Sequence, residues 1–342
     1  MSGIGLSFVI PVFNEEEGLP ELFRRLTALF STLDLECEVI LVDDGSRDDS
    51  WQQITELSRL DPRFRGLRLS RNFGHQTAIT AGIDIAEGDA VVIMDADLQH
   101  PPEFVPEMIA RWRDGFDVVY AVREDRTGES SFKRLTAIVF YGLLRRMTDV
   151  EMPAYVGDFR LVDRGAIDAF RSLRERNRYV RGMFSWIGFR QIGVPCPQAP
   201  RHAGRSKYTP RRMARLAIDG LLGFSNVPLR LALGVGSIVS TAAFLGGILA
   251  IAFKAGGIFT VPGWASIVVV VSFLGGFQLT VLGVIGAYIG RIYDEVKARP
   301  LYLVTEVAGI ELPRAETPAP GANPAAMAAL AAALGGRRRH RG

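Results

Sequence analysis

The segment Asp95–His100 holds two carboxylates two positions apart, directly after the apolar run Ala90–Met94. Side chains two positions apart on a strand point to the same side. We therefore expect Asp95 and Asp97 to face the same way where this strand gives way to a loop. Two like charges held so close repel each other unless a cation or hydrogen-bond donors lie between them. A hard divalent ion, Mg²⁺ or Mn²⁺, takes oxygen ligands of this kind and keeps coordination positions for substrate phosphates.

The alternative interpretation of an Asp-x-Asp pair is a solvated acidic loop, which is the usual outcome when the motif stands alone. In this chain the pair ends a strand of buried character and is followed by Gln99, a further oxygen ligand, and by two prolines. This context favours a metal site made by Asp95, Asp97 and Gln99.

Residues 1–125 alternate apolar runs with helical periodicity, which is typical of a mostly parallel α/β sheet covered on both faces. The expected strands are Leu6–Pro11, Glu38–Val42, Gly66–Leu69, Ala90–Met94 and Val118–Ala121. The expected helices are Gly18–Thr32, Ser50–Arg59, Gln76–Ala86 and Pro102–Asp114. Ligands bind such sheets beyond the carboxyl ends of the strands. Four strands are followed by polar residues, so we expect one site there, built from Asn14–Glu16, Asp43–Ser46, Ser70–Asn72 and Asp95–Asp97.

Composition and other motifs narrow the class of protein. The chain has 342 residues, a net charge of +3 and a pI near 9.0, and this mild charge gives no indication of nucleic acid as a partner. The first strand is not followed by a dinucleotide-binding G-x-G-x-x-G, and Walker-type phosphate loops are absent. Cys37, Cys196 and the four histidines lack metal-ligand spacing, and two cysteines suit a reducing cytosolic location. A signal peptide is not visible.

Two long stretches of the second half, Leu231–Phe253 and Val261–Gly290, carry no charge. About 20 apolar residues span a bilayer as a helix, so both are predicted to be transmembrane. The alternative is a pair of buried core helices. Between them, Lys254–Thr260 holds one positive charge, whereas both outer flanks are rich in arginine. The positive-inside rule therefore places both termini in the cytoplasm.

The stretch just before the first span combines apolar residues at helical spacing with three arginines. This pattern predicts an interfacial helix on anionic lipid, with a helix packed on the soluble domain as the alternative. A similar mix at Phe132–Met147 indicates a second such helix. The predicted segments are a cytosolic domain at 1–209, a basic amphipathic helix at 210–228, membrane helices at 229–253 and 263–290, an extracytoplasmic loop at 254–262, a cytoplasmic juxtamembrane segment at 291–312 and a disordered tail rich in Ala, Pro and Arg at 313–342.

Residues 5–305 resemble the polyprenyl-phosphate glycosyltransferases, a membrane-associated branch of the inverting family-two glycosyltransferases. Members of this branch include dolichol-phosphate mannose synthase, bactoprenol glucosyltransferase and the undecaprenyl-phosphate aminoarabinose transferase. The two-span hairpin matches the bacterial glucosyl and aminoarabinosyl members best. The motifs that carry the resemblance are Pro11–Glu16, Val42–Ser46, Arg71–Gly74, Asp95–Gln99, Gly157–Arg160 and Arg205–Tyr208.

The resemblance implies a Rossmann-like nucleotide-sugar domain of the GT-A kind, and it assigns roles by position. The donor-binding residues would be Pro11, Asn14, Glu15, Asp43, Asp44, Asp95, Arg205 and Lys207. The acceptor phosphate would be held by Arg123 and Arg134. The catalytic residues would be Asp95 and Asp97, the metal and diphosphate pair, together with Asp158, whose task stays open. Taken alone, the two arginines could be surface charges, Asn14–Glu16 a helix start, and Asp158 a partner of Arg160.

The implied reaction moves one sugar from a nucleotide-sugar donor to undecaprenyl phosphate on the cytoplasmic face of the bacterial inner membrane, for modification of a cell-envelope glycan. UDP-glucose is the first choice of donor; formyl-aminoarabinose, galactose, GlcNAc and mannose stay open. The acceptor phosphate is already ionised near neutral pH, so a strong general base is not required. Mg²⁺ or Mn²⁺ with Arg and Lys would stabilise the leaving diphosphate. Anionic membrane lipid and a homo-oligomer such as a tetramer are further expected partners.

Three other functions are weighed against this one. A processive polysaccharide synthase would carry a Q-x-x-R-W signature and more spans, and this sequence has neither. A non-catalytic membrane scaffold conflicts with the intact Asp95, Asp97 and Gln99. A lipid flippase is poorly served by two spans without an internal charged pathway.

Overall fold

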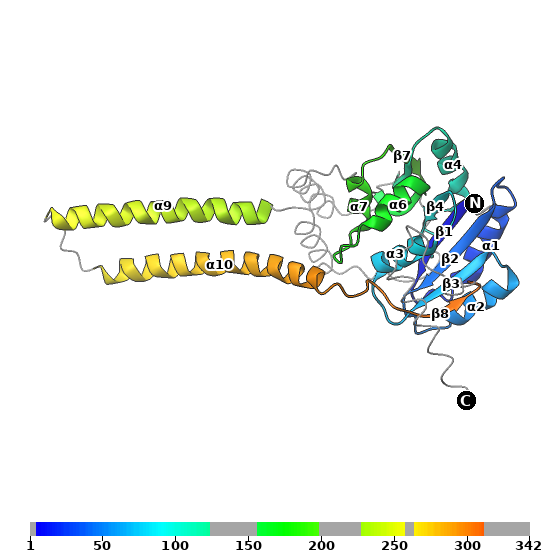
Figure 1. The fold of residues 1–342 in the computed structure, drawn as a ribbon, viewed down its shortest axis with the longest axis horizontal. Coiled ribbons are helices and arrows are strands. Elements are labelled where there is room, and N and C mark those ends of the chain that lie inside the picture. The colour runs from blue at the N-terminus through cyan, green and yellow to red at the C-terminus, as the bar shows by residue number, and fades with distance from the viewer. Residues whose placement is uncertain (1–4, 124–155, 198–226, 257–262, 311–342) are drawn as a thin grey trace, which may run out of the picture. The chain divides into compact units, whose positions relative to one another are not determined.

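A computed structural model describes residues 5–123, 156–197, 227–256 and 263–310 (Figure 1). The chain divides into two compact units. The sheet unit comprises the described residues 5–123, 156–197 and 299–310, and the helical unit comprises 227–256 and 263–298. The predictions for Arg134, Arg205, Lys207, the 132–147 helix and the 313–342 tail lie outside the described residues. The predicted 210–228 helix also lies outside them, except for residues 227 and 228, which begin a long helix described below.

The sheet unit contains a mixed sheet of eight strands in the order β7-β5-β6-β4-β1-β2-β3-β8. The strands are β1 (Leu6–Val12), β2 (Cys37–Asp43), β3 (Phe64–Leu69), β4 (Ala90–Ile93), β5 (Val118–Arg123), β6 (Val156–Asp163), β7 (Gln191–Cys196) and β8 (Val304–Ala308). Four adjacent strands are parallel to one another, in the order β4, β1, β2 and β3. β6 runs antiparallel to its neighbours β4 and β5, and β8 runs antiparallel to its neighbour β3. β1 and β2 are buried throughout, because helices cover both faces. The predicted α/β fold is confirmed.

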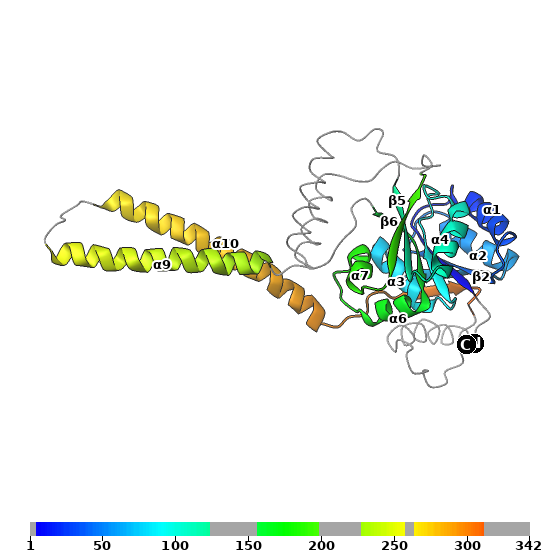
Figure 2. The same cartoon turned by 90° about the horizontal axis from the view of Figure 1, so that it is seen from above.

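Helices cover both faces of this sheet (Figure 2). One face is covered by α1 (Leu19–Phe30), α2 (Ser50–Leu60) and α4 (Val105–Arg113), the last preceded by a short 3-10 turn at Pro102–Phe104. The other face is covered by α3 (His75–Ile85), α6 (Arg164–Ser172) and α7 (Val180–Trp186). Alternate strand residues serve the two layers: Phe8 packs on Phe30 of α1, and Val9 lies against Gly82 of α3. The four predicted helices form within a few residues of their expected bounds.

The chain returns to the sheet after the two long helices. β8 pairs antiparallel with β3 and covers what would otherwise be an open sheet edge. Just before it, the buried Tyr302 donates its hydroxyl to Asp84 Oδ2 at 2.8 Å, and the Ser70 N–H donates to the Leu303 carbonyl at 2.8 Å. The sequence pattern did not predict β8, because residues 291–312 have the character of one juxtamembrane segment.

The helical unit consists of α9 (Val227–Ala255) and α10 (Trp264–Val296), which contact each other. Within them, Leu229–Leu249 and Val269–Val296 are long and apolar enough to cross a membrane. Their large apolar side chains are exposed, for example Leu233 at 71% and Leu279 at 71%. Such exposure is costly in water and favourable in hydrocarbon. The two apolar helices expected for a hairpin are therefore present.

Candidate active site

The loops after β1 and β2 are joined to each other at the carboxyl edge of the sheet. The Asn14 N–H donates to Ser46 Oγ at 3.0 Å, and the Arg47 N–H donates to Asn14 Oδ1 at 2.9 Å. The Glu15 N–H donates to Ser50 Oγ at 3.0 Å, in the first turn of α2. Asn14 is exposed and its backbone is left-handed, with φ 54°. The structure thus brings two predicted donor-binding residues together in one rigid loop pair.

The two aspartates at the end of β2, Asp43 in the strand and Asp44 just after it, are buried and hold neighbouring loops. Asp43 accepts the Ser46 N–H at 2.9 Å and lies 3.1 Å from Nε of Arg68. Asp44 accepts the N–H groups of Phe73 and Gly74 at 2.7 and 2.9 Å. Burial raises the pKa of Asp44, and these two hydrogen bonds oppose that rise. Both carboxylates therefore shape the edge by fixing the loops after β2 and β3. Pro11 is likewise buried, inside β1.

Glycine is required where these two loops meet. Gly45 has φ +71°, and a Cβ at this position would lie 2.7 Å from the carbonyl carbon of Arg71. A side chain would both strain the backbone and separate the loops. The DDGS motif thus keeps the strand-end loops in backbone contact.

The Asp95–His100 segment follows β4 as a turn, in which Leu98 has a left-handed backbone with φ 57°. Asp95, Asp97 and Gln99 are half-buried, whereas Ala96, Leu98 and His100 between them are buried. The three oxygen-bearing side chains are therefore the more exposed ones of this segment. Oδ1 of Asp95 is buried and accepts no hydrogen bond within the described residues. A buried carboxylate oxygen without a hydrogen bond fits a cation, and His75 Nε2 already lies 3.4 Å from this one.

A metal-ion cage is not formed by protein groups alone, since the described residues include no group of three or more His, Cys, Asp or Glu side chains that could hold a metal. Mg²⁺ is commonly held by one or two carboxylates, with water and substrate phosphates completing its shell. Two carboxylates and one amide oxygen fit that description. The donor set of Asp95, Asp97 and Gln99 thus suits a hard divalent ion that arrives with a diphosphate.

A second group of charges adjoins Asp95, and sequence reasoning missed half of it. His75, the first residue of α3, places Nε2 3.4 Å from Asp95 Oδ1 and 3.2 Å from Asp158 Oδ2. Arg181 of α7 donates from Nε and from its terminal nitrogen to the two oxygens of Asp158, at 2.8 and 3.1 Å. β6 pairs with β4 through Arg160 and Ile93, and this register sets Asp158 beside Asp95.

Arg160 is the partner that the sequence suggested for Asp158, but Arg181 is the closer one. The buried Arg160 guanidinium lies 3.9 Å from Asp158 Oδ1 and donates to the Gly157 carbonyl at 3.1 Å. Its guanidinium also lies over the Phe184 ring, 4.9 Å from the centroid. Asp158 is therefore surrounded by three cationic groups.

These contacts set the charge of each group. Burial raises the pKa of Asp95 to about 6, although His75 opposes the rise. Burial also acts to raise the pKa of Asp158, but the Arg181 charge and the His75 hydrogen bond hold it well below its usual range. The pKa of His75 is raised: burial lowers it, and the bond to Asp158 and the charge of Asp95 outweigh that effect. Asp158 is thus a carboxylate anion that holds the cationic side chains of His75 and Arg181 in place.

The predicted acceptor residue Arg123 is the last residue of β5, in register with Cys196 of β7. β5 is antiparallel to β6 and β6 is antiparallel to β4, so β5 runs parallel to β4. Arg123 therefore stands at the same edge of the sheet as Asp95.

Comparisons with known proteins agree with this architecture. Residues 7–171 match the family described as Glycosyl transferase family 2. An uncharacterized glycosyltransferase of Bacillus subtilis (YkcC) is 46% identical, covering 90% of this chain and 95% of its own. An uncharacterized glycosyltransferase of Synechocystis sp. is 44% identical over 90% and 97%. The bactoprenol glucosyl transferase of Shigella phage SfII is 40% identical over 87% and 97%.

The chain therefore belongs to glycosyl transferase family 2. It is a glycosyltransferase with a Rossmann-like GT-A domain, and the resemblance to the polyprenyl-phosphate glycosyltransferases is confirmed.

Proposed function

We propose that this chain transfers a single sugar from a nucleotide-sugar donor, with UDP-glucose as the first choice, to undecaprenyl phosphate. The observation that carries the proposal is the half-buried pair Asp95 and Asp97 at the carboxyl end of β4. The family supports a nucleotide-sugar donor, and the bactoprenol glucosyl transferase supports a polyprenyl phosphate acceptor. The exposed apolar helices α9 and α10 support a membrane location.

The donor diphosphate would be bound together with Mg²⁺ or Mn²⁺ at Asp95, Asp97 and Gln99. When bound, the ion neutralises charge that develops on the leaving nucleoside diphosphate. Asn14 and Glu15 offer groups to the nucleoside, while Pro11, Asp43 and Asp44 act through the loops they hold. Arg205 and Lys207 would close on the diphosphate, as the family motif implies.

We infer that Asp158 serves as a positioning residue for two cations. Its oxygens already accept from Arg181, and its pKa is held low, so it is a poor proton acceptor at neutral pH. The acceptor phosphate needs no base, but it needs donors that fork onto its oxygens. Arg181 and His75 keep 34% and 43% of their side chains exposed.

These cations, with Arg123 and Arg134, would hold the phosphate for in-line attack on the sugar. Such attack inverts the anomeric carbon, so an α-linked donor gives a β-linked product. A product linked α would contradict this mechanism.

The proposal places the chain in the bacterial inner membrane as a multi-pass protein, with the sheet unit and both termini in the cytoplasm. Glycine pairs in both long helices, Gly246–Gly247 and Gly275–Gly276, permit close helix contacts and would serve assembly into a tetramer. Anionic lipid would attract the basic segments beside the spans.

The test is transfer by the purified protein from a panel of radiolabelled UDP- and GDP-sugars to undecaprenyl phosphate. The reactions are run with Mg²⁺, with Mn²⁺ and with EDTA. We expect lipid-extractable label from one donor, and none when EDTA is present. If nucleotide binds while every donor fails to label the lipid, the proposed reaction is wrong.

A further inference from the structure

The strand that returns to the sheet after the two long helices brings an acidic residue close to the candidate site. Glu306 of β8 is in register with Arg68 of β3, and Arg68 is in register with Asp43 of β2. Side chains that face each other across neighbouring strands lie close enough to interact. Three charges of alternating sign therefore stand side by side across three strands, with the donor-site residue Asp43 at one end and Glu306 at the other.

The Arg68 guanidinium connects the two carboxylates. Its Nε lies 3.1 Å from Asp43 Oδ2, and its terminal nitrogen donates to Glu306 Oε1 at 3.0 Å. The Asp43 side chain is fully buried, whereas those of Arg68 and Glu306 are 30% and 35% exposed. A buried carboxylate needs a cation or hydrogen-bond donors at a fixed place, because water does not reach it. Glu306 binds one arm of the guanidinium and thereby holds the other arm toward Asp43.

Glu306 also contacts the start of α2. The Trp51 indole N–H donates to Glu306 Oε2 at 3.3 Å, and the indole ring lies 5.7 Å from the guanidinium carbon of Arg68. The preceding residue, Ser50, accepts the Glu15 N–H from the loop after β1. The two oxygens of Glu306 therefore reach two residues, one behind the loop after β1 and one behind the loop after β2.

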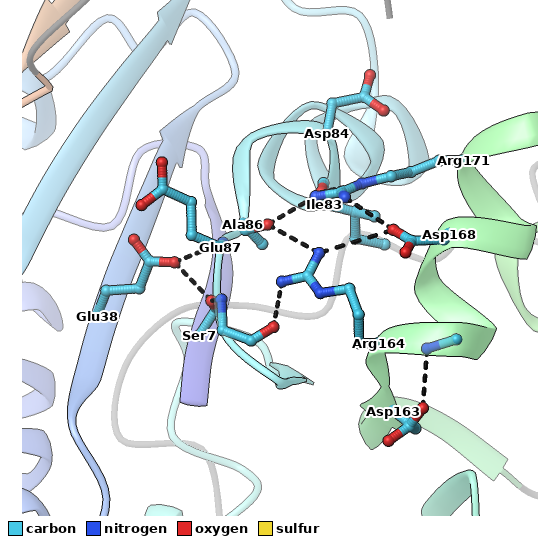
Figure 3. Close-up of polar contacts among 12 residues, drawn as sticks. Ser7, Glu38, Ile83, Asp84, Ala86, Glu87, Asp163, Arg164, Asp168 and Arg171 are labelled. Carbon is cyan, nitrogen blue, oxygen red and sulfur yellow. Dashed lines mark hydrogen bonds and ion pairs between the residues drawn. The ribbon is translucent and has the colours of Figure 1, made fainter. Parts of the chain in front are cut away.

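A second polar contact of the returning chain serves a different element. Tyr302 donates to the buried Asp84 near the carboxyl end of α3, and Arg174 donates to both oxygens of the same carboxylate at 3.0 Å. Arg171 donates to two backbone carbonyls at this helix end, at 2.7 and 2.6 Å (Figure 3). These groups belong to α3, α6 and the chain just beyond α6, not to the loops after β1 and β2. Tyr302 and Glu306 thus differ in what they hold, although both follow α10.

We propose that Glu306 is a positioning residue for the nucleoside part of the donor. It acts through Arg68 and Trp51 and keeps the loops after β1 and β2 in the arrangement that binds the nucleotide. A binding loop held in its bound form raises affinity, because less ordering is left for the ligand to impose. The inference rests on the donor site of the proposed function. It adds that the chain beyond the two long helices helps to shape that site.

The test measures binding of UDP and of GDP, each with Mg²⁺, to the purified full-length protein by titration calorimetry. Glu306→Ala removes both contacts, and Glu306→Gln keeps an oxygen acceptor without the charge. Tyr302→Phe is the matched control, because it removes one polar contact of the same segment to a buried carboxylate. Initial rates of sugar transfer are measured at varied nucleotide-sugar and at varied undecaprenyl phosphate, and thermal melting is recorded for each protein.

We expect Glu306→Ala to weaken binding of the nucleotide that the native protein binds by at least about fivefold, and to raise the KM for the nucleotide-sugar by a similar factor. Its kcat and its KM for undecaprenyl phosphate should change less than about twofold. Glu306→Gln should lie between Glu306→Ala and the native protein, with at least about twofold weaker binding, and it carries the test if Glu306→Ala does not fold. Tyr302→Phe should bind nucleotide within about twofold of the native affinity although it melts at a lower temperature.

Unchanged nucleotide binding in the Glu306 variants would overturn the inference and leave the proposed function standing. Weakening by Tyr302→Phe that equals the weakening by Glu306→Ala would also overturn it, because general destabilisation would then explain both. If the native protein binds nucleotide but transfers no sugar, the proposed function fails alone, and the binding comparison still decides the inference. A native protein that binds neither nucleotide would contradict both.

Discussion

Joint removal of Asp158 and Arg181 tests whether this aspartate acts through its arginine. Breaking a buried charge pair from one side costs about 3–5 kcal/mol when nothing else compensates the remaining charge. Asp158 keeps His75 at 3.2 Å and Arg160 at 3.9 Å, and about a third of the Arg181 side chain is exposed. We therefore expect Arg181→Gln to lower the free energy of unfolding by about 1–3 kcal/mol, which thermal melting would detect.

The larger effect should fall on catalysis. Loss of one preorganised phosphate-binding donor typically reduces the rate about 100-fold or more. Since Asp158 holds Arg181, we expect Asp158→Asn, Arg181→Gln and the double variant to be similarly slow, with a coupling of about 1–3 kcal/mol between the sites. Arg181→Lys keeps the positive charge but loses the paired N–H donors of the guanidinium, so its transfer rate should lie between those of these variants and that of the native protein.

The assay measures initial rates of sugar transfer at fixed donor and varied polyprenyl phosphate. Arg24→Gln, which removes a 69% exposed arginine from α1, is the control and should change the rate less than about twofold. Losses that multiply in the double variant would contradict the positioning role, because they would show that Asp158 has a task of its own, such as accepting a proton.

Three further results concern the fold. Gly45→Ala should destabilise by at least about 2 kcal/mol, because it adds a backbone clash to the left-handed strain. Gly74→Ala meets no atom but has φ +102° and ψ 150°, a region that glycine occupies almost alone, so it should cost about 1–3 kcal/mol from backbone strain only; chemical unfolding measures both. Tyr302→Phe should lower the unfolding free energy by about 1–2 kcal/mol, since the buried Asp84 loses a donor. Burial raises the pKa of Cys37 to about 11, so its neutral thiol stabilises the fold below the ordinary value of 9.0, and this contribution is lost as the pH rises. The stability difference between native protein and Cys37→Ala should shrink by about 2 kcal/mol from about pH 8 to about pH 10.5.

β1, β2 and β4 were predictable because each contains an apolar run that is buried on both faces. β6 was not, because Asp158, Arg160 and Asp163 interrupt its pattern, and the partners that make these charges tolerable come from other parts of the chain. β8 could not be predicted for a different reason. It is a short edge strand that follows two membrane-type helices, and only the pairing with β3 shows that it belongs to the sheet.

The candidate site was likewise predictable from the sequence only in part. Asp95 and Asp97 could be singled out because their spacing and the preceding strand predict a shared side. His75 could not, since one histidine without ligand spacing carries no signal, although it directly follows the quoted Arg71–Gly74 motif. Arg181 lies in an arginine-rich stretch where the sequence cannot tell which arginine reaches Asp158; that is decided by α7 packing on β6.

Two aspartate variants compared in the transfer assay give the sharpest test of the proposed metal and diphosphate site. Asp97→Asn removes one carboxylate from the half-buried pair, and Asp114→Asn removes an exposed one at the end of α4. Both purified proteins are given Mg²⁺, the active nucleotide-sugar and undecaprenyl phosphate, and the label in the lipid extract is counted. We predict a loss of at least about 100-fold for Asp97→Asn and near-native transfer for Asp114→Asn. Full transfer by a folded Asp97→Asn protein would contradict the proposed site.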